Sequence, residues 1–196
     1  MQSDLLTTEQ LRLQVEKLHI QHIKLCQDNF LYFVQEVWPD FICRKEKQRS
    51  KWGHHQIIAN EFTEISDNKK GRLIINMPPR HTKSEFASVY YPAWIIGRNP
   101  KMKIMQVSHN TELAVRFGSK VRNIIDSPEY KQIFGDVKLR EDSKAKGRWE
   151  TNHGGEYYAA GVGASITGRG ADLLIIDDPH TEQDSMSDLA MERAYD

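Results

Sequence analysis

Apolar residues recur at intervals of three and four near the start of the chain, which predicts an amphipathic helix over residues 7–27. Thr7 or Thr8 suits the first position of this helix. A second, more apolar helix is predicted over residues 29–38, and Pro39 ends it because the residue before a proline disfavours helical geometry. The positions on the predicted inner faces are Leu11, Val15, Leu18, His22 and Leu25 in the first helix and Phe30, Leu31, Phe33, Val34 and Val37 in the second.

A basic segment, residues 44–51, follows these helices. We interpret it as a solvated connector, because runs of charge usually face water. Contact with DNA is the alternative interpretation. The cations concerned are Arg44, Lys45, Lys47, Arg49 and Lys51.

From His54 onward, strand patterns and helix patterns alternate. This alternation is typical of an α/β fold, and we expect a mainly parallel central sheet covered by helices on both faces, with an N-terminal helical arm. Residues 138–148 are polar and predict no definite element. The predicted elements are a helix over 54–65, a strand over 72–77, a helix over 84–96, a strand over 102–108, a helix over 110–125 capped by Asn110, and strands over 155–160 and 173–177.

Composition adds few constraints. The chain has 196 residues, a formal net charge of zero and a pI near 7.1, so no field from the whole molecule favours a nucleic acid or a membrane. Any site for a polyanion must be local. Cys26 and Cys43 are expected to be reduced thiols of a cytoplasmic protein, without a disulfide. No apolar run reaches the roughly 20 residues that span a bilayer.

The loop after the first predicted strand carries residues suited to phosphate binding. A strand that turns sharply into a helix points several backbone N–H groups at one spot. Lys83 would neutralise the β and γ phosphates, and the Ser84 hydroxyl would coordinate Mg2+. The G-x-x-x-x-G-K-[ST] pattern is broken by Met77 and Thr82, which stand where glycines belong.

Two features of the loop compensate for the missing glycines in this interpretation. Pro78 and Pro79 preset an extended backbone, and Arg80 adds a second cation over the phosphates. The alternative is an ordinary turn with a solvent-exposed lysine.

Two carboxylates, Asp177 and Asp178, follow the apolar run 173–176. An acid at the end of a buried strand needs a metal or a partner, so Asp177 suits a Mg2+ ligand and Asp178 suits the group that polarises the attacking water. A turn or a helix cap is the alternative interpretation. Together with Lys83 and Ser84, the pair predicts an enzyme that hydrolyses ATP with Mg2+.

Residues 52–188 resemble the ATPase domain of phage terminase large subunits, the motors that pack viral DNA into procapsids. This resemblance implies a P-loop NTPase-like domain over residues 52–196 after an arm and connector over residues 1–51. The stretches that carry the resemblance are His54 and Gln56, Pro78 to Glu85, Ala93-Trp94 with Gly97 to Pro100, Gly161 to Gly163, Ile166 to Asp172, and Leu174 to Pro179. Thr82 departs from the glycine that is common before the lysine in that family.

The resemblance also implies roles for single residues. Lys83, Asp178 and Arg80 would be catalytic, while Ser84 and Asp177 would hold the metal. Pro79, Arg80, His81, Thr82, Lys83, Ser84 and Glu85 would bind the nucleotide phosphates, and His54 and Gln56, with Trp52 and His55, would lie near the adenine. Core packing for Trp52 and helix-start polarity for His54 and Gln56 are the alternatives.

Motors of this kind use an arginine from a neighbouring subunit, and the candidates here are Arg169, Arg116 and Arg122. An ordinary surface ion pair is the alternative for each of them. Residues 108–110 are a candidate sensor of the nucleotide or of DNA. We favour the alternative, in which Asn110 caps the next helix.

The partners implied by the resemblance are double-stranded DNA, the portal protein, the small terminase subunit and further copies of the chain in a ring, without a membrane. The location implied is the host cytoplasm, transiently at the procapsid portal. A nuclease domain and the strand with the coupling motif are not found in the sequence, so we expect a fragment or the product of a split gene. A helicase-like translocase and a non-catalytic nucleotide- or DNA-binding assembly module are the alternative functions.

Overall fold

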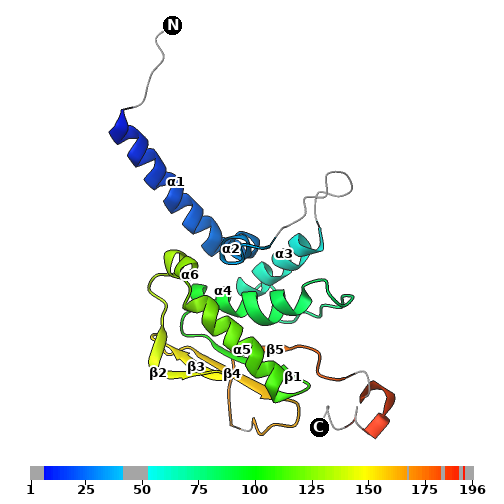
Figure 1. Ribbon diagram of the computed structural model, residues 1–196. Coiled ribbons are helices and arrows are strands. Elements are labelled where there is room, and N and C mark those ends of the chain that lie inside the picture. Colours follow the sequence, from blue (N-terminus) through cyan, green and yellow to red (C-terminus); the bar gives the residue numbers. More distant parts are fainter. Residues whose placement is uncertain (1–6, 42–52, 167, 182–183, 190–191, 193–196) are drawn as a thin grey trace.

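A computed structural model describes residues 7–41, 53–166, 168–181, 184–189 and 192. The basic segment 44–51, Cys43 and Trp52 lie outside these residues. In the described part, six α-helices and one π-helix accompany a five-stranded sheet (Figure 1). None of the described helices is long and apolar enough to cross a bilayer.

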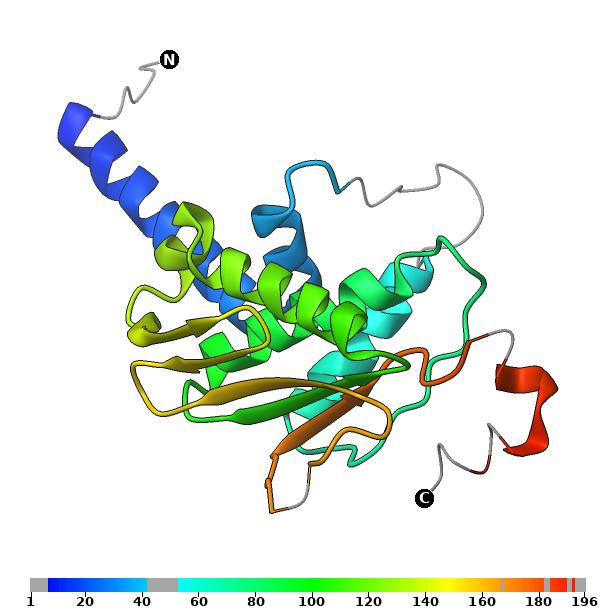
Figure 2. The ribbon, with the colours of Figure 1, turned by 60° about the horizontal axis from the view of Figure 1, so that its bottom comes forward.

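The two N-terminal helices form close to the predicted bounds, but the inner face predicted for the first helix is wrong, because Leu11, Val15, Leu18 and Leu25 are exposed. α1 (Thr8–Asp28) starts with a capping box in which Thr7 and Gln10 exchange side chain to backbone hydrogen bonds, and Asn29 caps α2 (Phe30–Val37). α2 buries its apolar face, whereas α1 projects from the body and buries only Cys26 (Figures 1 and 2). The apolar residues of α1 that stay exposed are Leu11, Leu13, Val15, Leu18, Ile20 and Leu25.

Three of the predicted helices are confirmed near the sheet: α3 (His54–Ser66), η1 (Glu85–Tyr90) continued by α4 (Tyr91–Arg98), and α5 (Thr111–Ile125). α6 (Pro128–Ile133) was not predicted from the sequence. η1 is a π-helix that runs directly into α4, and Pro92, which has no N–H, cannot donate to the carbonyl of Ser88. A short 3-10 helix, η2 (Asp184–Met186), lies near the C-terminal end.

The sheet is mixed, so the expectation of a mainly parallel sheet is wrong. Its order is β2-β3-β4-β1-β5, with β1 parallel to both β4 and β5 while β2, β3 and β4 are antiparallel neighbours. The strands are β1 (Lys103–Ser108), β2 (Leu139–Ala145), β3 (Arg148–Thr151), β4 (Glu156–Gly161) and β5 (Leu173–Ile176).

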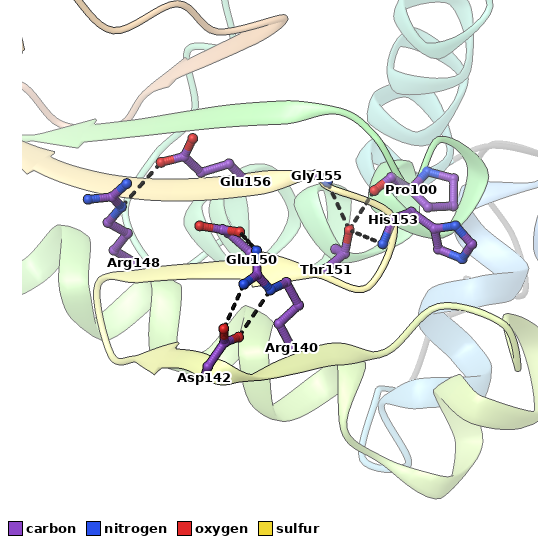
Figure 3. A network of polar contacts seen from close by, with 9 residues as sticks. All are labelled: Pro100, Arg140, Asp142, Arg148, Glu150, Thr151, His153, Gly155 and Glu156. Atoms are coloured by element: carbon purple, nitrogen blue, oxygen red, sulfur yellow. Dashed lines mark hydrogen bonds and ion pairs between the residues drawn. The ribbon is translucent and has the colours of Figure 1, made fainter.

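Strands β2 and β3 were missed because their sequence is polar. Arg140 of β2 pairs across to Glu150 of β3 and also with Asp142 in its own strand, and Arg148 of β3 pairs with Glu156 of β4 (Figure 3). At the β3–β4 turn, the buried Thr151 hydroxyl donates to the carbonyl of Pro100 at 2.7 Å and accepts from the backbone N–H groups of His153 and Gly155 (Figure 3). Cross-strand charge pairs therefore accompany the strand pairing, while β3 alternates exposed Arg148 and partly buried Glu150 with buried Trp149 and Thr151.

The strand predicted over residues 72–77 does not form. Residues 72–78 belong to no helix and join no strand of the described sheet. Leu73, Ile75 and Met77 pack against the core, while Ile74 is 86% exposed. An apolar run encodes a preference for burial, whereas a strand also requires a neighbouring backbone that offers hydrogen bonds.

Helices cover only one face of the sheet among the described residues, so the expectation of two covered faces is also wrong (Figure 1). Trp149 of β3 donates to the Gly118 carbonyl of α5, and Gln106 of β1 bonds to Ser88 of η1 on the same face. On the other face, Leu174 and Ile176 of β5 are 54% and 58% exposed.

Candidate functional site

The two segments that the sequence predicts to meet do meet. Lys83 Nζ lies 2.5 Å from Asp178 Oδ1 and 3.2 Å from Asp177 Oδ1, although Lys83 and Asp178 are 95 residues apart. The acids follow β5 at its carboxyl end, and the lysine lies in the loop between residues 72–78 and η1. One ammonium group thus bridges two adjacent carboxylates.

The environment of this bridge favours charge. Burial disfavours the ammonium form, but the hydrogen bond to Asp178 and the charge of Asp177 outweigh it, so the pKa of Lys83 lies above its ordinary value. The Asp177 side chain is only 4% exposed, against 57% for Asp178. Asp177 is therefore the buried anchor of the pair, and Asp178 faces solvent.

A buried polar chain fixes the orientation of Asp177. Ser88 Oγ donates to Asp177 Oδ2 at 2.9 Å, and Gln106 Nε2 donates to Ser88 Oγ at 3.3 Å. Ser88 and Gln106 are fully buried. The hydrogen bond from Ser88 thus fixes Asp177 Oδ2, while Asp177 Oδ1 faces Lys83.

The sequence reasoning did not find Ser88 or Gln106. The signal for Gln106 was present, because an amide in the middle of an apolar strand must find partners when it is buried. Its Oε1 atom and the Ser108 hydroxyl are buried without a hydrogen-bond partner among the described residues. Gln106 Oε1 and the Ser108 hydroxyl could therefore each accept or form a further hydrogen bond near the acid pair.

Backbone strain concentrates at the same place. Among the described residues, the non-glycine residues with positive φ are Asn68, Arg80, Thr82 and Asp178, at 56°, 64°, 65° and 45°. Three of these four belong to the loop or to the acid pair, and Thr82 is β-branched, for which this conformation is especially unfavourable. Each such residue costs about 1–3 kcal/mol and persists only where its surroundings enforce it.

His55 of α3 supports the strained loop. Its Nε2 atom lies 2.8 Å from Thr82 Oγ1, and the Thr82 hydroxyl donates to the His81 carbonyl at 2.5 Å. Because that hydroxyl proton is already used, His55 Nε2 must be the donor in their contact. Burial, with a smaller effect from the neighbouring His54, lowers the pKa of His55 to about 4, so the ring is neutral at pH 7.

The remaining loop residues have separate positions. His81 Nδ1 lies 2.9 Å from the Pro79 carbonyl, and the Glu85 carboxylate pairs with Lys120 of α5. Arg80 is exposed, and Ser84, next to Lys83, is partly buried at the start of η1. The loop therefore presents Arg80 to solvent beside the Lys83 bridge.

The residues expected near an adenine do not share one orientation. The His54 ring centre lies 5.9 Å from that of His81, and His54 lines a largely apolar groove of about 380 Å3 between α3 and residues 73–77. Gln56 Nε2 instead donates to Asn60 on its own helix. His54 therefore borders the loop, whereas Gln56 is bonded within α3.

The candidate trans-acting arginines lie on other elements. The Arg169 guanidinium lies 4.0 Å from the centre of the Tyr158 ring and 3.6 Å from Glu156, at the amino end of β4. Arg116 and Arg122 are carried by α5. The expectation that Asn110 caps α5 is confirmed, because its Oδ1 accepts from the Leu113 N–H at 2.8 Å.

No protein-family model matches the sequence. The chain is 26% identical over 143 residues to the large subunit of the terminase from Enterobacteria phage T3. The aligned stretch covers 71% of this chain but 23% of that protein, so the chain spans less than a quarter of the relative. This likeness supports a distant relationship to a terminase large subunit.

The lowered pKa of His55 predicts a specific pH dependence of stability. The unfolded chain binds a proton at His55 below its ordinary pKa of 6.5, whereas the folded chain does so only below about 4, so stability falls as pH falls through this window. The glutamine of a His55→Gln variant cannot titrate. We therefore expect the free energy of unfolding to fall by roughly 1 kcal/mol less in the variant than in the parent chain between pH 7 and pH 5. Urea unfolding at both pH values measures the difference.

His19→Gln on the exposed part of α1 is the control and should keep the pH response of the parent chain. Equal pH responses of the parent chain and His55→Gln would contradict a neutral, partly buried His55.

Proposed function

We propose that this chain binds and hydrolyses ATP with Mg2+ and forms part of a phage DNA-packaging motor with a P-loop NTPase-like domain. The observation that carries the proposal is the Lys83 ammonium between Asp177 and Asp178, at the end of a strained loop. An ATPase needs this combination, because the cation stabilises phosphate charge and the acids serve the metal and the water.

The acid pair suits a metal ion. The two carboxylates already share one positive charge, that of Lys83, and Ser88 orients the buried carboxylate of Asp177. Asp177 and the Ser84 hydroxyl would hold Mg2+, which prefers oxygen ligands. When bound, the ion supplies positive charge that offsets the negative charge of the β and γ phosphates.

Binding of nucleotide would change the partners of Lys83. Its ammonium would leave the two carboxylates and contact the β and γ phosphates, and Arg80 would add a second cation from its exposed position in the loop. The release of Lys83 would free Asp178, whose 57% exposed side chain would orient a water in line with the γ phosphate and accept its proton.

The motor role rests on the relationship to the terminase large subunit of phage T3. We propose that a ring of these chains on the portal, loaded by a small terminase subunit, moves double-stranded DNA into a procapsid in the host cytoplasm. The grip on the DNA backbone would be independent of sequence and weakened by salt. A strand-separation assay on a forked duplex distinguishes this motor from a helicase-like translocase, because only the translocase would separate the strands.

A second candidate function is a nucleotide-binding assembly module without turnover. The feature that favours it is Thr82, whose side chain bonds to His55 and whose backbone is strained where the family usually has glycine. Tight binding of Mg·ATP without release of phosphate would identify such a module.

We expect Lys83→Ala to abolish ATP hydrolysis by the assembled motor, because phosphate charge loses its main cation; a loss of about 100-fold or more is expected. Lys83→Arg keeps a positive charge and so preserves folding, but should lose most turnover because the guanidinium has a different shape. Phosphate release and Mg·ATP binding are measured on the same preparations.

Lys69→Ala is the matched control, since Lys69 is exposed and pairs only locally with Asp67. Full turnover in both Lys83 variants would reject the assignment of this loop.

Arg80→Gly should separate stability from activity. Glycine adopts the positive φ of this position without strain, so we expect the free energy of unfolding to rise by about 1 kcal/mol. The loss of the guanidinium should lower phosphate release at least tenfold, by the rough size of a single charge-stabilising group. Urea unfolding and a phosphate assay measure the two effects.

Asn68→Gly is the control for the backbone, because Asn68 also has a positive φ but lies in the turn after α3. It should leave turnover unchanged. An Arg80→Gly variant that is fully active would show that Arg80 does not contact the phosphates.

A further inference from the structure

The arm helix α1 is held to the body at its C-terminal end. Cys26 is its buried residue, and the Cys26 carbonyl accepts from Trp94 Nε1 at 3.0 Å. Gln27 Nε2 donates to the Ile133 carbonyl of α6 at 2.6 Å. The direction of the projecting arm therefore depends on a few contacts in one short region (Figure 1).

Three side chains with metal-binding groups converge in this region. His22 and Cys26 lie four residues apart on α1, so they share one face of the helix, and Glu36 reaches them from α2. His22 Nε2 lies 2.9 Å from Glu36 Oε2 and 3.7 Å from Cys26 Sγ. The three candidate ligand atoms all lie within 4.8 Å of one another.

These separations suit a tetrahedral ion. Zn2+ binds nitrogen and oxygen at about 2.0 Å and sulfur at about 2.3 Å, which places a nitrogen, an oxygen and a sulfur ligand roughly 3.3–3.5 Å from one another. His22 and Cys26, 3.7 Å apart, and His22 and Glu36, 2.9 Å apart, each need to shift by only a few tenths of an ångström, and the Cys26 and Glu36 ligand atoms lie within 4.8 Å of each other. An imidazole, a thiolate and a carboxylate are all ligand types that zinc accepts.

We propose that His22, Cys26 and Glu36 form a zinc site that fastens the arm helix α1 to α2. The Cys26 thiol releases its proton to solvent as its sulfur binds the ion, and neutral His22 binds through Nε2. His22 and Glu36 are 48% and 36% exposed, so a water completes the tetrahedron from the solvent side. The site is separate from the Lys83 bridge and does not depend on ATP hydrolysis.

The site holds the arm in the direction that it has in the structure. The other contacts of α1 with the body are hydrogen bonds and packing in its last turns. A metal that joins α1 and α2 stabilises the folded chain by binding it and not the unfolded chain.

Titration of the metal-free chain with Co2+, followed by displacement with Zn2+, tests the site. We expect one equivalent of Co2+ with the visible bands of four-coordinate cobalt and a thiolate-to-cobalt absorption in the near ultraviolet. Zn2+ should abolish both and raise the melting temperature. Cys26→Ser should lose the thiolate band, and His22→Gln and Glu36→Gln should each weaken metal affinity at least tenfold.

His19→Gln and Cys43→Ser are the matched controls and should bind like the parent chain; Cys43 lies outside the described residues. Glu36→Gln alters a partly exposed side chain, so it tests the site even if substitution of the buried Cys26 prevents folding. Absence of a thiolate band in the parent chain, or unchanged affinity in Glu36→Gln, would overturn the proposal and leave an ordinary His22–Glu36 ion pair.

Discussion

The structure depends on one cation shared by two acids. Asp177 is almost fully buried, and a buried carboxylate without a partner costs several kcal/mol. Lys83 supplies the partner, with Ser88 bonded to the other oxygen, and thereby joins the loop before η1 to the end of β5. Any ligand that draws Lys83 away must leave another cation with Asp177. This requirement links nucleotide binding to metal binding in the proposed function.

The bridge also explains why an unfavourable backbone persists around it. Arg80, Thr82 and Asp178 adopt positive φ angles, and the contacts of Lys83 and His55 hold the loop in place. Strain of this kind is common at functional sites, where a loop is kept ready for a ligand at the expense of stability. A fold optimised only for stability would place glycine at these positions. The strained positions therefore agree with the proposed phosphate-binding role.

Local signals predicted most helices, because caps and three- and four-residue periodicity lie within each segment. Strands were predicted less well, since pairing involves distant backbone: residues 72–77 join no described strand, and β2 and β3 consist mostly of charged and polar residues. The meeting of Lys83 with Asp177 was predicted correctly from their complementary chemistry, although the strand expected before Lys83 does not join the sheet. The roles of Ser88 and His55 were not, because only tertiary packing brings Ser88 to Asp177 and His55 to Thr82.

A structure of the chain with Mg2+ and a non-hydrolysable ATP analogue tests whether the Lys83 bridge is the nucleotide site. We expect Lys83 Nζ to leave Asp178 Oδ1, now 2.5 Å away, and to bind the β and γ phosphates, while Asp177 keeps its bond to Ser88 and faces the metal. A nucleotide bound elsewhere, with the bridge from Lys83 to Asp178 intact, would contradict the account.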